Sequence, residues 1–192
     1  MLKLITRSID RWAIRFLPLL EKVFRKHKCP VGSSLRVDET YILVKGVWKY
    51  LYRAVDKAGK TIDFLLTAKR DKKAAMRFFE KAMQANGIPE KVTMDKSGAN
   101  KSAIDQISED KDIANDVRQN KYLNNIVEQD HRAVNRKTRP MLGFKSFNAA
   151  ASVLAGIELV HMIHKGPLAM PVCERMTVAN QFYALAGQAR PA

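Results

Sequence analysis

The spacing of apolar residues divides the chain into a helical beginning, a β-rich stretch and a longer part in which helices dominate. Between Ile9 and Val23 apolar residues recur every three or four positions, which predicts an amphipathic helix. Pro18 is expected to break this helix or to begin a new one. After Leu35 the pattern changes to short β-rich runs around 37–43, 48–55 and 61–67, separated by turn sequences. These runs predict three antiparallel strands joined by hairpins.

Helices and short strands alternate in the rest of the chain. Helical spacing predicts helices over 71–86, 125–139 and 147–164, with weaker patterns over 99–107 and 178–185. Short strands are expected over 91–94 and 117–122, and the acidic stretch 108–116 is expected to form an exposed loop. The element order predicts an α/β fold with a mixed five-stranded sheet and flanking helices, which matches the ribonuclease-H-like fold.

The length adds a domain plan to this pattern. A chain of 192 residues suits about one domain of roughly 150 residues with a small appendage. A linker containing Pro30, Gly32, Ser33 and Ser34 separates the first helix from the β-rich part. We therefore expect a helical segment and linker over 1–34, a core domain over 35–165 and a C-terminal tail over 166–192.

Charge and composition indicate the class of partner and the cellular compartment of the protein. Lys and Arg number 34 against 19 Asp and Glu, which gives a net charge of +15 and indicates a polyanion, above all nucleic acid. Two cysteines make no disulfide framework, which favours the cytoplasm. Arg7, Asp10 and Arg11 interrupt any signal peptide. The most apolar stretch, 149–163, is too short to cross a membrane, so no membrane association is expected.

Three carboxylates are expected to meet at one edge of the sheet. Asp38 lies in the first strand, Asp95 ends the fourth, and Glu128 is near the start of the following helix. Carboxylates brought together need a cation, and oxygen ligands open to substrate suit two Mg²⁺ ions, with Mn²⁺ as a substitute. Each residue also has an ordinary structural interpretation, as a strand end, a turn former or a solvated helix charge. Glu39 lies on the opposite strand face and is expected to be structural or solvated.

Longer motifs decide between these alternatives. The segments 37–41, 50–56, 95–99, 121–131 and 142–147 resemble those of DDE transposases in the bacterial insertion-sequence group known as the IS-six family. The resemblance extends from about Thr6 to the end of the chain. It implies a retroviral-integrase-like core in which Asp38, Asp95 and Glu128 are catalytic and hold the metal ions. It also implies replicative transposition, in which water exposes a transposon 3′-OH that then attacks target DNA.

A basic region surrounds the third carboxylate and is expected to contact DNA. His131 shares the helix face of Glu128 and is expected either to contact scissile DNA or to orient a ligand, with a packing role as the alternative. The other residues expected to bind DNA are Lys121, Arg132, Arg136, Lys137, Arg139 and Lys145. The expected partners are transposon-end and target DNA, together with a second copy of the chain in a dimer or larger assembly. Such a protein would work in the bacterial cytoplasm at the nucleoid.

Two departures from the family pattern keep other functions open. Most of the family's N-terminal helix-turn-helix domain is missing, so we expect an N-terminally truncated relative with doubtful recognition of specific ends. Asn135 stands where the family has a Lys seven residues after the catalytic Glu. One alternative function is therefore a catalytically impaired, DNA-binding transposase fragment. The other is a ribonuclease-H-type nuclease that cuts hybrids.

Overall fold

The computed structural model describes residues 2–113, 116–120, 125–166 and 176–189. The chain divides into two compact units. One unit is the continuous segment Pro30–Gly143, and the other combines Met1–Cys29 with Phe144–Ala192. The first unit contains the sheet, and the second is helical in its described residues.

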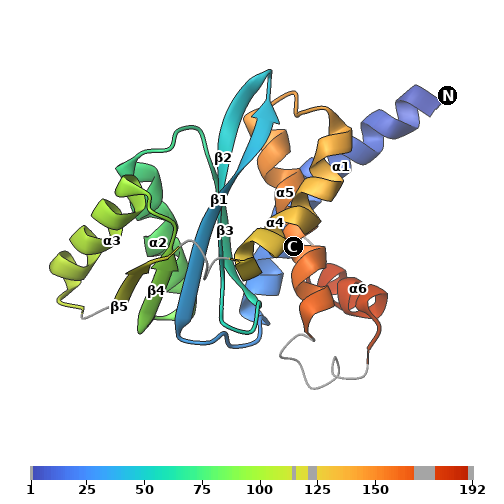
Figure 1. Ribbon diagram of the computed structural model, residues 1–192. Coiled ribbons are helices and arrows are strands. Elements are labelled where there is room, and N and C mark those ends of the chain that lie inside the picture. The colour runs from blue at the N-terminus through green and yellow to red at the C-terminus, as the bar shows by residue number, and fades with distance from the viewer. Residues whose placement is uncertain (1, 114–115, 121–124, 167–175, 190–192) are drawn as a thin grey trace. The chain divides into compact units, whose positions relative to one another are not determined.

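The sheet unit is built on five strands in the order β3-β2-β1-β4-β5 (Figure 1). β1 pairs antiparallel with β2, as β2 does with β3, whereas β4 is parallel to both β1 and β5. Lys45 and Gly46, both with positive φ, form the tight hairpin between β1 and β2. The mixed five-stranded sheet expected from the sequence is thus confirmed. Its strands are β1 (Ser34–Val44), β2 (Val47–Val55), β3 (Thr61–Thr67), β4 (Lys91–Met94) and β5 (Asp116–Gln119).

Helices flank this sheet on both faces (Figure 1). α2 (Lys72–Asn86) and α3 (Gly98–Lys111) share a buried apolar cluster with Val37 of β1 and Tyr52 of β2. α4 (Asn125–Thr138) instead contacts Asp38 and Thr40, which alternate with Val37 along β1. Because side chains alternate across a strand, α4 lies on the opposite face from α2 and α3.

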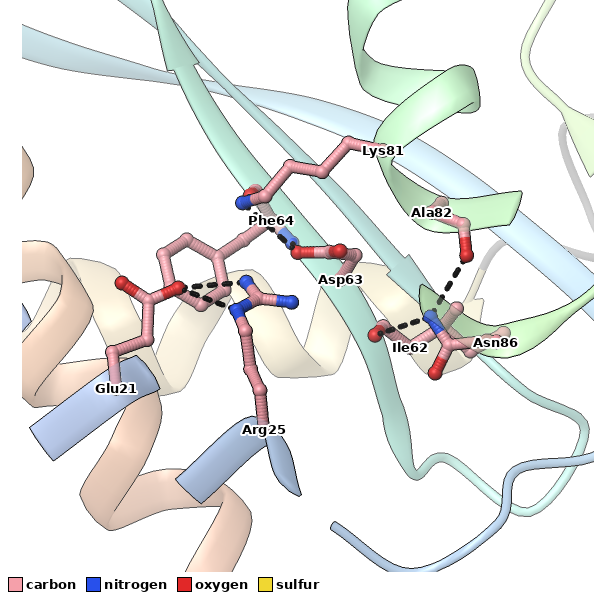
Figure 2. Close-up of polar contacts among 8 residues, drawn as sticks. All are labelled: Glu21, Arg25, Ile62, Asp63, Phe64, Lys81, Ala82 and Asn86. Carbon is pink, nitrogen blue, oxygen red and sulfur yellow. Dashed lines mark hydrogen bonds and ion pairs between the residues drawn. The ribbon is translucent and has the colours of Figure 1, made fainter. Parts of the chain in front are cut away.

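Polar contacts fasten α2 to β3 (Figure 2). Nζ of Lys81 donates to the carbonyl oxygen of Phe64 over 2.7 Å and lies 3.2 Å from Oδ1 of Asp63. Near the end of the helix, Nδ2 of Asn86 donates to the carbonyl oxygens of Ile62 and Ala82 over 3.3 and 2.9 Å. These bonds satisfy buried polar groups that the helix covers when it packs on the sheet.

The helical unit contains α1 (Leu2–Lys26), α5 (Phe147–Lys165) and α6 (Val178–Gln188). Leu20 and Phe24 of α1 share a core with Leu159 of α5 and Leu185 of α6. By length and composition, α5 is the one helix among the described residues that could cross a membrane, and 44% of its apolar window is buried. A core helix of a globular unit meets the same criterion, and α5 packs in this way against α1 and α6.

Two local predictions are wrong. α1 continues through Pro18, which is exposed, so water can hydrate the carbonyl of Ile14 that the missing N–H leaves without its helical partner. The expected loop over 108–116 begins later, because α3 continues through Lys111 and ends where Asp112 adopts a left-handed conformation. Ser108 is half-buried and residues 109–111 are exposed, so the last turn of α3 extends into solvent, where its polar side chains are hydrated.

Candidate active site

The two predicted aspartates directly follow the last ladder pair of two neighbouring parallel strands: Asp38 lies within β1, which continues to Val44, and Asp95 follows the end of β4. The ladder between β1 and β4 ends with Val37 opposite Met94. Asp38 and Asp95 are the next residues along the chain, Asp38 within β1 and Asp95 in the turn that follows β4. The side chain of Asp38 is 23% exposed, and Asp95 is exposed. Two carboxylates that follow the same ladder pair, both accessible from solvent, are available to bind a cation.

Helix α4 covers the face of β1 that carries Asp38. Nε2 of His131 lies 3.3 Å from Oδ2 of Asp38, within ion-pair distance but without hydrogen-bond geometry. One helical turn later, Nδ2 of Asn135 donates to Oγ1 of Thr40 over 3.3 Å. His131 is buried, whereas Asn135 is half-buried. The structure therefore places His131 directly against a predicted metal ligand.

The third carboxylate lies on the same stripe of α4. Glu128 precedes His131 by three residues and Asn135 by seven, so the three side chains share a helix face. From His131 to Asn135 the helix rises about 6 Å, and from Asp38 to Thr40 the strand advances about 6.6 Å, so α4 and β1 run in the same direction. Three residues back along α4 is about 4.5 Å, so Glu128 lies about one helical turn from His131, on the side toward the start of β1. Its side chain is exposed.

The carboxylates nevertheless do not form a ligand cluster in the structure. Across the parts of the chain that the structure describes, no group of three His, Cys, Asp or Glu side chains is arranged to hold one metal ion. The donor chemistry fits a hard divalent cation, because carboxylate oxygens are the ligands that Mg²⁺ prefers. Shared metal binding by Asp38, Asp95 and Glu128 stays a prediction, supported by the strand register and by the direction of α4.

Sequence reasoning missed a buried ion pair beside the site. Arg53 of β2 lies opposite Asp38 in the antiparallel register and is fully buried. Its Nη2 atom is 3.4 Å from Oδ2 of Asp130, two residues after Glu128. The signal was a charged residue inside the apolar run Leu51–Val55, because a buried arginine needs a partner. The pair connects the helix of Glu128 to the sheet.

Glu39 faces away from Asp38, as strand alternation predicts. Its Oε1 atom accepts a 2.7 Å hydrogen bond from Nδ2 of Asn100, and its Oε2 atom pairs with Nε of Arg70. Burial raises the pKa of Glu39 more than the bond from Asn100 and the charge of Arg70 lower it. Burial also raises the pKa of the neighbouring Tyr52 phenol. The Glu39 carboxylate is thus engaged on the face opposite the predicted metal site.

The cations expected to bind DNA are mostly exposed. Within the sheet unit, the exposed ones are Arg132, Arg136 and Lys137 on α4, followed by Arg139 in the short 3₁₀ turn η2 (Arg139–Met141). Lys145 is exposed and belongs to the helical unit. Lys121 lies outside the described residues. The exposed side chains are free to reach phosphate groups, which is the requirement for nonspecific DNA contact.

Comparison with known proteins identifies relatives over most of the chain. The DDE domain family matches residues 32–167. A transposase for the insertion sequence-like element IS431mec from Staphylococcus aureus is 36% identical over 160 residues, which are 82% of this chain and 70% of the relative. A transposase for the insertion sequence element IS257 in transposon Tn4003, also from Staphylococcus aureus, shows the same identity and coverage.

Solved structures share the fold at low sequence identity. The catalytic core domain of BIV integrase superposes with a TM-score of 0.53 at 14% identity, covering 82% of this chain and 97% of the integrase. A chain of the simian T-cell lymphotropic virus intasome in complex with PP2A regulatory subunit B56 gamma superposes with a TM-score of 0.50 at 13% identity. The match covers 81% of this chain and 56% of the intasome chain. These similarities confirm the ribonuclease-H-like fold that the element order predicts and the retroviral-integrase-like core that the family resemblance implies.

Proposed function

The chain belongs to the DDE domain family of transposases, and we propose that it cuts DNA strands and joins them to target DNA during replicative movement of an insertion sequence. An enzyme of this kind is a polynucleotidyl transferase. The observation that carries the proposal is the position of Asp38 and Asp95 directly beyond the last pair of the parallel ladder between β1 and β4. This arrangement brings two carboxylates to neighbouring segments of a fold shared with the integrase core.

We assign the metal-binding role to Asp38, Asp95 and Glu128. DDE transposases generally use a divalent metal, and the oxygen donors of these residues fit two Mg²⁺ ions, with Mn²⁺ as a substitute. When bound, such ions activate the attacking oxygen and stabilise the leaving 3′ oxygen at phosphorus. The three carboxylates balance the positive charge of the ions, and their positions fix the direction of attack. His131, 3.3 Å from Asp38, orients that ligand, which is the second of its two expected roles.

DNA is the proposed substrate and partner. The exposed cations of α4 and η2 follow Glu128 along the chain, so a phosphate backbone bound to them would pass close to the carboxylates. The net charge of +15 strengthens this attraction at a distance. We include Lys121 and Lys145 in the same DNA-binding set. Contacts of this kind position the backbone and carry little sequence information.

Assembly and location follow from this reaction. Joining a transposon end to a target requires the protein to hold more than one DNA segment, and we propose a homodimer or a larger assembly on DNA. The substrate is chromosomal or plasmid DNA, so the working location is the bacterial cytoplasm at the nucleoid. The relatives with 36% identity are bacterial proteins, which agrees with this location.

A plasmid-cleavage assay tests the proposed chemistry. The purified chain is incubated with supercoiled plasmid and Mg²⁺ or Mn²⁺, and nicked and joined products are separated on gels. We expect products that disappear with a chelator and in the variants Asp95→Asn and Glu128→Gln, both of which keep DNA binding. Asp105→Asn is the matched control, because Asp105 is an exposed partner of Lys101 on α3.

Two outcomes of this assay would contradict the proposal. Products that persist unchanged in Asp95→Asn and Glu128→Gln would contradict the assignment of these carboxylates. DNA binding by the parent chain without any metal-dependent product would instead favour the catalytically impaired fragment.

A further inference from the structure

The parallel ladder between β1 and β4 stops one residue before the two aspartates. β1 continues past Asp38 and stays paired with β2 as far as Val44. After Met94 the other strand leaves the sheet, because the amide of Ser97 donates to the carbonyl oxygen of Asp95 over 2.7 Å and closes a tight turn. Asp95 therefore lies in a turn next to the sheet, and its position relative to Asp38 depends on contacts outside this ladder.

A side-chain hydrogen bond connects the two segments directly beyond the ladder. Asn100, in the first turns of α3, donates from Nδ2 to Oε1 of Glu39 over 2.7 Å. Glu39 follows Asp38 on β1, and Asn100 follows Asp95 by five residues. The bond thus joins the strand of one aspartate to the helix that the turn of the other aspartate leads into. It does so on the sheet face opposite the predicted metal site.

The burial of the Asn100 side chain indicates that its hydrogen bond to Glu39, and not packing alone, favours an asparagine at this position. Asn100 is 2% exposed, and its Oδ1 atom has no hydrogen-bond partner among the described residues. A buried polar atom without a partner is unfavourable. An apolar side chain would fill the same space without that cost, so packing alone does not explain an asparagine here. The donated bond to Glu39 offers the compensating interaction.

Arg70 completes the cluster from a third direction. It lies between β3 and α2, directly before Asp71, whose Oδ1 atom caps α2 by accepting from the amide of Ala74 over 2.8 Å. The guanidinium pairs with Oε2 of Glu39, whose side chain is 8% exposed. The positive charge of Arg70 thus lies against the carboxylate oxygen that Asn100 does not contact. Oε1 of Glu39 accepts a hydrogen bond from Asn100, and Oε2 forms an ion pair with Arg70.

We propose that Asn100, Glu39 and Arg70 form a positioning cluster that holds the turn of Asp95 in register with the strand of Asp38. The proposal rests on the proposed function, because the register of the two aspartates matters only if they share a metal site. The cluster touches neither metal nor DNA. It acts through the backbone, so its loss lowers metal affinity and leaves the ligand set unchanged.

A donor and acceptor exchange tests the cluster with Mn²⁺ alone as the probe. Asn100→Asp places a second carboxylate against Glu39 and breaks the bond. The double variant E39Q/N100D restores it with the roles reversed, since the side-chain amide introduced at position 39 donates to the new carboxylate and offers its oxygen to Arg70. The net charge of the double variant equals that of the parent. Asn86→Asp, which changes an amide that fastens α2 to β3 (Figure 2), is the matched control.

Binding is measured from the electron paramagnetic resonance signal of free Mn²⁺, and folding from circular dichroism. We expect Asn100→Asp to weaken Mn²⁺ binding about tenfold, the double variant to recover most of that loss, and Asn86→Asp to bind like the parent. Equal binding by Asn100→Asp and Asn86→Asp overturns the cluster. So does a loss that the double variant fails to recover. If Asn100→Asp does not fold, Asn100→Ala takes its place with the same expected loss.

Two further variants separate this inference from the proposed function. Asp38→Asn and Asp95→Asn each remove a predicted ligand and are expected to abolish the Mn²⁺ binding. If both bind Mn²⁺ like the parent, the metal site is assigned wrongly, and the cluster falls with it. If both lose binding while Asn100→Asp does not, the metal site stands and the positioning role alone is refuted.

Discussion

The fully buried guanidinium of Arg53 connects β2 to α4 through Asp130. Removing one member of a buried ion pair generally costs about 3–5 kcal/mol, because the other charge stays out of water. We expect Asp130→Asn to lower the free energy of unfolding by about 3 kcal/mol in urea titrations. Asp105→Asn, which breaks an exposed pair with Lys101, is expected to cost less than about 1 kcal/mol. Equal small losses would contradict the structural importance of the buried pair.

Asn135 offers a gain-of-function prediction at the same scale. It lies on the same face of α4 as Glu128 and His131, and its side-chain amide donates to Thr40. The family resemblance implies a lysine at position 135. Asn135→Lys adds a cation beside the proposed DNA path, so we expect tighter DNA binding and a salt dependence steeper by about 0.9 in log–log slope. Fluorescence anisotropy at several salt concentrations measures both.

A matched charge addition controls that experiment. Gln84→Lys adds the same charge on an exposed position of α2. If both variants steepen the salt dependence equally, the increase comes from net charge alone, and the proposed DNA path along α4 is wrong.

Single residues were more predictable than their partners. Asp38, Asp95 and Glu128 could be singled out from the sequence because turns, strand ends and family motifs mark them. The partners of the buried charges could not. Arg53 and Asp130 are 77 residues apart, and Glu39 and Asn100 are 61 apart. Such pairs depend on strand register and on which face a helix covers, and neither is encoded locally.

At the scale of elements, α1 and α5 meet at a position without a side chain. A Cβ atom on Gly156 would lie 2.7 Å from Cδ1 of Leu17, so the buried glycine admits that leucine. We expect Gly156→Leu to overpack this contact and to cost about 1–3 kcal/mol, seen as a lower Tm. Adding Leu17→Ala in the same chain provides space and is expected to recover most of the loss. A double variant no more stable than Gly156→Leu would contradict the packing described.

Elements with strong periodicity were predicted well, and their ends less well. The strands and α2 appear where alternation and turn residues indicate them, because one buried face dictates each pattern. Pro18 is a local signal for a helix end, but packing of α1 against α5 and α6 overrides it. The polar end of α3 has no buried face to mark it, so its last turn resembled a loop in the sequence.

At the scale of the whole molecule, the sequence predicted the fold class and the family but not the grouping of the helices. The apolar spacing of α5 indicates that this helix is buried, but it does not indicate which elements the helix packs against. In the structure α5 packs with α1 and α6, which come from opposite ends of the chain. The excess of basic residues was informative at this scale, because net charge concerns partners and not fold.

The central claim is that Asp38, Asp95 and Glu128 together form one metal-binding site. Fe²⁺ bound in place of Mg²⁺ generates hydroxyl radicals in the presence of ascorbate and peroxide, and these radicals cut the nearby backbone. Mass spectrometry of the fragments is therefore the most direct measurement. We predict cuts near all three residues, suppressed by excess Mg²⁺ and lost together in Asp38→Asn but not in Asp105→Asn. Cuts near only one of the three segments, or cuts that Asp38→Asn leaves unchanged, would contradict the account.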